Sequence, residues 1–215
     1  MTGMREEVLQ EAKRSDCFLC RPNAALLGRL GRSGYLLAGL GPLADGYAVV
    51  ASHAHLRGLK DAGPDLRLAY SNFAAESAQT LAEQFGACFV VEHGNMAVCG
   101  IPEEGREHCF HPHFLLIPAS GLSVEPFLDY FGRSTVFETL HAAIEFGIDK
   151  GQYVLAGHSE GPFHVFLPDG ELPRQFARGL VAEQLDQSEL ASWRDQPNLA
   201  WTLANAELLK EIFAR

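Results

Sequence analysis

The stretch HPHFLLIP, residues 111–118, carries the strongest signal in this chain and decides the fold we expect. Residues two apart on a strand face the same side of a sheet, so His111 and His113 are predicted to point together. Pro112 lacks a backbone donor, which favours a place at a sheet edge or beside a bulge. Two imidazoles so placed suit metal ligation or phosphate chemistry, although two surface histidines on an edge strand would give the same pattern.

The rest of the chain contains short apolar runs and amphipathic segments. The clearest helix spans residues 65–85, where apolar side chains recur at helical spacing between Pro64 and Gly86. Further helices are predicted at 6–14, 135–146, 172–183 and 199–213, and strands at 34–38, 47–52, 87–92, 110–118, 153–157 and 163–166. This order favours an α+β fold, with an antiparallel sheet flanked by helices, over βαβ winding.

The composition sets the class of protein. The chain has 215 residues, of which 47% are hydrophobic and 20% charged, so we expect a globular protein. Its formal net charge of −10 argues against binding to long nucleic acid, whose backbone is also negative. The longest apolar runs, such as 47–51 and 114–118, are too short to cross a membrane. The first 15 residues lack the apolar run of a secretory signal, and we therefore expect a cytoplasmic protein.

Five cysteines include one close pair, Cys17 and Cys20. Without an export signal, that spacing indicates a metal-binding or redox pair rather than a disulfide framework. Two thiolates and two distant histidines make a plausible tetrahedral zinc set, and soft sulfur ligands favour zinc over magnesium or calcium. The spacing alone does not connect particular histidines to the cysteines, and two buried cysteines would give the same pattern.

Three blocks of the sequence together resemble the histidine-triad (HIT) superfamily in their order and approximate spacing. They are DCFLC at 16–20, GYAVVASHAH at 46–55, and EHG at 92–94 leading to the stretch 111–118. The resemblance implies a HIT-like core with a zinc-binding N-terminal segment over residues 1–120. Residues 121–215 are then a C-terminal α/β extension packed on the same core. Within it, QFAR at 175–178 and WR at 193–194 are similar to a segment that follows the core in some longer members.

The family motif has three alternating histidines followed by apolar residues, and two registers are open here. Counting back from the trailing apolar residues and proline makes His111 the first histidine and His113 the second, and puts Leu115 at the third position. The other register makes His111 the second histidine, with Cys109 in first place. We prefer the former because His-Pro-His then resembles the galactose-1-phosphate uridylyltransferase branch, in which glutamine holds the third position.

In the preferred register the resemblance implies that His113 attacks the α-phosphate of a nucleotide and forms a nucleotidyl-histidine intermediate. The other ring nitrogen of His113 should donate to a backbone carbonyl, which fixes the tautomer. The protein would then be a nucleotide phosphohydrolase or nucleotidyltransferase acting on a small nucleotide or nucleotide conjugate. A homodimer would be in keeping with the family.

The resemblance also implies a structural zinc ion that closes the N-terminal segment onto the catalytic strand. Its ligands would be Cys17, Cys20, His55 and His111. His53 competes with His55 for this role because only one residue lies between them. We favour His55 by its position after the predicted strand.

Leu115 departs from the family motif because leucine cannot donate a hydrogen bond to the phosphate or leaving group. Candidate substitutes for the missing donor are Asn95 and His108, and His93 is a candidate to line the same pocket. Each also has a plain structural explanation, as a turn residue, a solvated loop residue or a partner of the backbone. If nothing substitutes, the protein is a catalytically impaired nucleotide-binding or regulatory protein, or a zinc-stabilised scaffold without a ligand.

Overall fold

A single antiparallel sheet of eight strands runs through the computed structural model, which describes residues 17–95 and 111–214. The strand order is β1-β2-β3-β5-β4-β7-β8-β6, and every neighbouring pair is antiparallel. The strands are β1 (Leu27–Leu30), β2 (Gly34–Ala38), β3 (Ala48–Ser52), β4 (Phe89–Gly94), β5 (His113–Ile117), β6 (Thr135–Phe137), β7 (Tyr153–His158) and β8 (Phe163–Phe166). The predicted α+β class with an antiparallel sheet is therefore confirmed.

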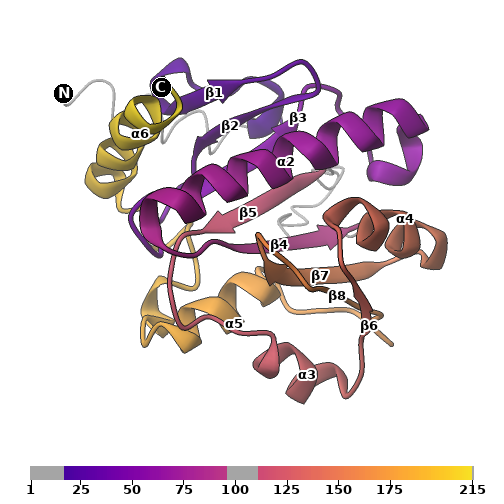
Figure 1. Ribbon diagram of the computed structural model, residues 1–215. Helices are drawn as coiled ribbons and strands as arrows, with labels where there is room; N and C mark the ends of the chain where they lie inside the picture. The colour runs from indigo at the N-terminus through magenta and orange to yellow at the C-terminus, as the bar shows by residue number, and fades with distance from the viewer. Residues whose placement is uncertain (1–16, 96–110, 215) are drawn as a thin grey trace, which may run out of the picture.

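Helices cover both faces of this sheet (Figure 1). One face carries α2 (Pro64–Phe85), α4 (Leu140–Lys150) and α6 (Leu199–Phe213), and the other carries α3 (Glu125–Phe131) and α5 (Phe176–Gln184). Short 3-10 turns complete the described elements: η1 (Phe18–Cys20), η2 (Ala24–Leu26), η3 (Leu59–Asp61) and η4 (Ser188–Leu190). Among the helices described, none combines the length and apolar character needed to span a membrane.

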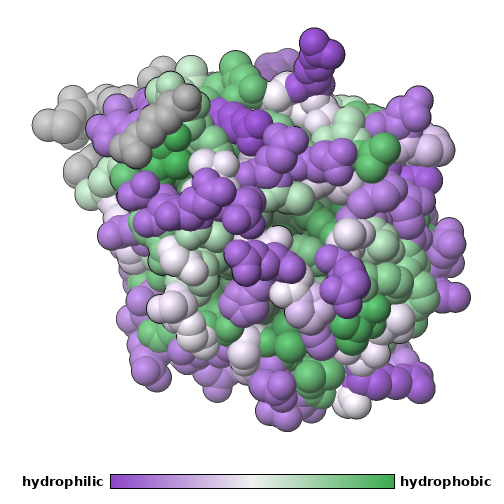
Figure 2. All heavy atoms as spheres, viewed as in Figure 1, coloured by the Kyte–Doolittle hydropathy of each residue, from purple (hydrophilic) through white to green (hydrophobic). Residues whose placement is uncertain are grey.

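The long helix α2 forms where the sequence predicts it. Pro64 occupies its first turn, and Gly86 ends it in a left-handed conformation with φ of 86°, donating its backbone N–H to the carbonyl of Ala82. Tyr70 and Phe73 lie on the side buried against the sheet. Figure 2 shows hydrophilic residues along the opposite, solvent-facing side of this helix. Packing of one face, rather than helix propensity alone, holds α2 in place.

The strand that carries His113 lies in the interior of the sheet, and the expectation of a sheet edge or bulge at Pro112 is wrong. Strand β5 is flanked by β3 on one side and β4 on the other. Pro112 immediately precedes β5, where its missing N–H is not needed by the ladder. Its carbonyl accepts hydrogen bonds from the buried Tyr70 hydroxyl at 3.1 Å and from the Ser52 backbone at 3.4 Å.

Residues beyond 120 extend the same sheet rather than starting another one. Strand β7 pairs with β4 along its whole length, and β8 and β6 follow it outward. The helix predicted over 135–146 is wrong at its beginning: Thr135–Phe137 is the edge strand β6, and α4 starts only at Leu140. The Thr139 hydroxyl accepts a hydrogen bond from the Ala142 backbone and caps the helix there.

The helix α6 holds the turn between β2 and β3. The Asn205 side chain accepts from the Gly46 backbone N–H and donates to the carbonyl of Ala44, both at 3.1 Å. Trp201 donates its indole N–H to Asp45 at 2.7 Å. Asn205 is buried, and the backbone groups of this turn satisfy its amide.

The predicted helix at 199–213 is confirmed, whereas the one at 6–14 lies outside the described residues.

Candidate metal centre and active site

Four cysteine and histidine side chains converge at one end of β5. Their ligand atoms all lie within 4.8 Å of one another; the residues are Cys17, Cys20, His55 and His111. The Sγ of Cys20 lies 3.0 Å from the Nδ1 of His55 and 3.7 Å from the Nδ1 of His111, and the Sγ of Cys17 lies 3.4 Å from the latter. These four residues could hold a metal ion.

Three separate segments bring these four side chains together. Cys17 immediately precedes the single turn η1 and Cys20 ends it, and the Cys20 N–H donates to the carbonyl of Cys17. His55 follows β3, and the hydroxyl of Ser52 at the end of that strand donates to the carbonyl of Ala54 at 2.7 Å and shapes the turn. The fourth residue, His111, is buried directly before β5.

The ring of His111 is set for ligation through one nitrogen only. Its Nε2 lies 2.7 Å from the carbonyl oxygen of Ser52. A carbonyl can only accept, so Nε2 carries the hydrogen and the Nδ1 lone pair faces Cys17 and Cys20. A backbone partner on the far nitrogen is the usual way in which proteins orient a metal-binding histidine.

His53 lies outside this cluster. Its Nε2 lies 2.8 Å from the carbonyl of Gly31, and its ring lies beside Tyr35 with centroids 5.7 Å apart. Tyr35 in turn donates its hydroxyl to the carbonyl of Leu19, between the two cysteines. Burial, with the neighbouring Cys17 and Cys20 adding to it, raises the pKa of Tyr35 above its usual value.

The ring of His113 lies half-buried at the start of β5. Its Nδ1 lies 2.8 Å from the carbonyl oxygen of His111, so Nδ1 carries the hydrogen and Nε2 keeps its lone pair. Among the described residues Nε2 has no hydrogen-bond partner. This arrangement orients the imidazole and leaves its Nε2 as the nitrogen that could attack an electrophile.

Leu115 shares a face of the sheet with His113, two residues along the strand. It pairs with Val91 of β4 and Val49 of β3, and it is only partly buried. The leucine side chain at this motif position therefore lies on the same face of the sheet as the ring of His113.

His93 lies on β4 and connects this face to helix α5. Its Nε2 accepts a hydrogen bond from the backbone N–H of Ala177, in the first turn of α5, at 3.2 Å. Enclosure of the ring, with nearby His113 adding to the effect, lowers the pKa of His93 to about 3. A neutral His93 thus satisfies one of the free N–H groups at the α5 N-terminus, close to His113.

Glu92 lies on the opposite face of the sheet, under the same strands. It is buried and accepts a hydrogen bond of 2.8 Å from the Tyr153 hydroxyl. Burial raises the pKa of Glu92 to about 7, although the bond from Tyr153 and the charge of His113 both act in the other direction. Sequence reasoning did not single out this buried carboxyl or its tyrosine partner.

The remaining candidates have different surroundings. Asn95 donates its amide to the carbonyl of Gly151 at 2.7 Å, with φ of 56°, and its Oδ1 is buried against Gly58 without a hydrogen-bond partner among the described residues. Its proposed role as a substrate donor stays a prediction. His108 lies outside the described residues.

Sequence reasoning also missed the polar contacts that fix the backbone of the site. The Tyr70 hydroxyl donates to the carbonyls of Val50 at 2.9 Å and Pro112 at 3.1 Å and is fully buried. A tyrosine on the core side of a predicted helix is the only sequence signal for such a role.

Comparison with protein-family models and with curated proteins gives no match for this chain.

Proposed function

We propose that the cluster of Cys17, Cys20, His55 and His111 binds a structural zinc ion. Two thiolates and two imidazoles are a ligand set that zinc favours, and ideal tetrahedral bonds would place sulfur and nitrogen about 3.6 Å apart. The three Sγ–Nδ1 distances of 3.0, 3.4 and 3.7 Å are close to this value. The ion would join the η1 turn to the start of the catalytic strand.

We further propose a HIT-like protein that acts on the α-phosphate of a small nucleotide through His113. The observation that carries this proposal is the bond between His113 Nδ1 and the carbonyl of His111, which leaves Nε2 as the nucleophile. Nε2 would form a bond to phosphorus while the bond from phosphorus to the leaving oxygen breaks, and the leaving group takes the electron pair. The carbonyl of His111 would stabilise the positive charge that develops on the ring.

A second substitution would complete the reaction. Water or a second phosphate attacks the phosphorus, the bond to Nε2 breaks, and neutral His113 is restored. With water the protein is a nucleotide phosphohydrolase, and with a phosphate acceptor it is a nucleotidyltransferase. Both outcomes use the same geometry at His113.

Leu115 supports one alternative function, a nucleotide-binding or regulatory protein with impaired catalysis. It occupies the face of β5 beside His113, where a glutamine or histidine would donate a hydrogen bond. Loss of one such donor can lower a rate by about 10²–10³-fold. In this alternative the nucleotide binds at the same place, but the covalent intermediate does not accumulate.

Intact-mass measurement tests the proposal directly. The protein is incubated with diadenosine polyphosphates, nucleotide sugars and adenylylated amines, and the mass is searched for an added nucleotidyl group. We expect an adduct that His113→Ala abolishes and that the matched control His53→Ala retains. If no substrate gives an adduct, or if His113→Ala turns over like the unchanged protein, the catalytic proposal is wrong. Nucleotide binding without an adduct would favour the alternative.

A further inference from the structure

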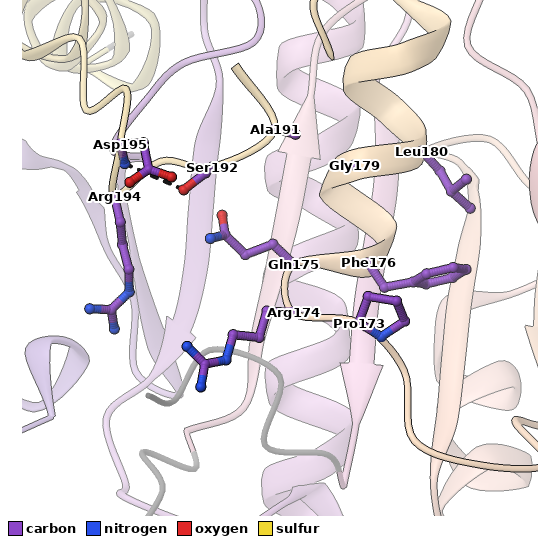
Figure 3. Close-up of a pocket in the computed structure, with 10 residues that line it drawn as sticks. All are labelled: Pro173, Arg174, Gln175, Phe176, Gly179, Leu180, Ala191, Ser192, Arg194 and Asp195. Atoms are coloured by element: carbon purple, nitrogen blue, oxygen red, sulfur yellow. Dashed lines mark hydrogen bonds between the residues drawn. The ribbon is translucent and has the colours of Figure 1, made fainter. Parts of the chain in front are cut away.

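A pocket of about 520 Å³ lies beside the N-terminal end of α5. Figure 3 shows that Arg174 and Gln175, just before the helix, line one side of it, and Arg194 lines another. The two sides are tied together, because the Gln175 side chain accepts from the backbone N–H of Trp193 at 3.2 Å. In the view of Figure 3 the side chain of Arg194 extends downward and that of Arg174 extends to the left, and both residues are exposed. One acidic side chain, Asp195, also lines it.

A third arginine lies behind the pocket wall. Arg178 is 2% exposed and donates to the carbonyls of Gly41, Leu190 and Ala191, the last of which lines the pocket. Its Nη1 is buried without a hydrogen-bond partner, and it pairs with no carboxylate in the part of the chain described. Its guanidinium also lies 5.4 Å from the centroid of the Tyr47 ring, and a bound anion nearby would add to these contacts.

The pocket lies close to the proposed nucleophile. Ala177 in the first turn of α5 contacts His93, and His93 lies beside His113 because Glu92 pairs with Phe114 across β4 and β5. From Ala177 back to Arg174 is three residues, at most about 11 Å of backbone. The first two N–H groups of α5 are already used, because Phe176 donates to the carbonyl of Pro173 and Ala177 donates to His93. The attraction for negative charge on this side of His93 therefore comes from the two arginines that line the pocket rather than from free helix N–H groups.

We propose that Arg174 and Arg194 bind the phosphate groups beyond the α-phosphate of the substrate. This inference rests on the proposed function of His113 and deepens it, because it selects the substrate class. The substrate is then a nucleoside polyphosphate or dinucleoside polyphosphate, whose leaving group is an anion, rather than a nucleotide joined to a neutral amine. Guanidinium groups suit this role because they bind phosphate oxygens in a bidentate manner.

Binding measurements test this without depending on turnover. Calorimetric titrations of AMP, ATP and inorganic tripolyphosphate are made on the unchanged protein, on Arg174→Gln, on Arg194→Gln and on the double variant. Arg133→Gln, an exposed arginine after α3, is the matched control. We expect ATP to bind at least about 10-fold more tightly than AMP, and each pocket variant to weaken ATP and tripolyphosphate by about 10-fold. AMP affinity should change little.

The outcomes separate this inference from the proposed function. If the double variant binds ATP as tightly as the unchanged protein, if ATP and AMP bind equally, or if Arg133→Gln weakens binding as much, the pocket assignment is wrong. If the arginine dependence holds while His113 forms no adduct, the anion site stands and the catalytic proposal fails. Binding of tripolyphosphate alone, with no preference for ATP over AMP, would overturn the assignment to a nucleotide substrate.

Discussion

His113 donates its Nδ1 hydrogen to the carbonyl oxygen of His111, and the Nδ1 of His111 faces two cysteines. One peptide unit therefore joins the metal cluster to the candidate nucleophile. Any movement of His111 changes the acceptor that fixes the His113 tautomer. The two candidate sites are therefore linked through the backbone, and a metal bound by the four-residue cluster would also help to orient the ring of His113.

Replacement of Leu115 tests the weak point of the catalytic proposal. Leu115→Gln places an amide donor beside His113, and we expect the rate of adduct formation to rise about 10- to 100-fold. Leu115→Met keeps the volume without a donor and is the control, with an expected change of less than about 3-fold. Single-turnover kinetics with a diadenosine polyphosphate measures both. Equal rates in the glutamine and methionine variants would show that another residue already supplies the donor.

Removal of one metal ligand should lower stability much more than removal of its neighbour. His55→Ala leaves three ligands, and we expect less than about one zinc ion per chain and a fall in Tm on the order of 10 °C. His53→Ala loses the contacts of the ring with Gly31 and Tyr35, neither of which is a ligand, and should retain the metal. Metal analysis with thermal unfolding, with and without a chelator, checks this. Full metal content in His55→Ala would show that the ligand assignment is wrong.

Glu92 should make the protein less stable as pH rises. Its folded pKa of about 7 exceeds the ordinary 4.5, so the folded state holds the proton more tightly. The contribution of Glu92 to the free energy of unfolding is therefore complete below pH 4.5, falls between pH 4.5 and 7, and stays low above pH 7. Glu92→Gln removes this dependence, which amounts to a few kcal/mol at most. Urea unfolding at pH 5 and pH 8 measures it, and an unchanged difference between the two pH values counts against it.

His93 should act in the opposite direction. Its folded pKa of about 3 lies below the ordinary 6.5, so the unfolded chain binds the proton more tightly. Its contribution is complete above pH 6.5 and is lost as pH falls toward 3, at no more than about 1.4 kcal/mol per pH unit. His93→Gln can still accept from Ala177 but does not titrate, and should flatten the acid side of the stability curve. An unchanged slope between pH 6.5 and 4.5 would contradict this.

The sequence predicted helices and strands correctly where the spacing of apolar residues is regular and a turn follows at each end. The range 199–213 is the helix α6, and 34–38 is the strand β2, because each has clear apolar spacing and a turn at its ends. The prediction of a sheet edge or bulge at Pro112 was wrong, because the missing N–H of a proline does not tell whether the residue lies inside a strand or just before it. The edge strand Thr135–Phe137 was predicted as helix, because three residues are too few to show the alternation of apolar and polar residues that indicates a strand.

The candidate site was predictable only in part. The grouping of Cys17 and Cys20 with His55 and His111 followed from a family resemblance, since their spacing alone does not connect them. The choice between His53 and His55 depends on the turn after β3, which the Ser52 hydroxyl shapes. The sequence singled out Arg194 within WR at 193–194, but it did not predict that this segment lines a pocket with Arg174, because the contact of Gln175 with Trp193 is tertiary.

The contact between Gly46 and Asn205 links residues 159 apart in the sequence. During synthesis at about 5–20 residues per second, β2 and β3 leave the ribosome on the order of 10 s before the asparagine that secures their turn. The nascent chain must carry this turn without its anchor for that interval. A chain that ends before α6 would leave the backbone groups of Ala44 and Gly46 without the partners that Asn205 supplies.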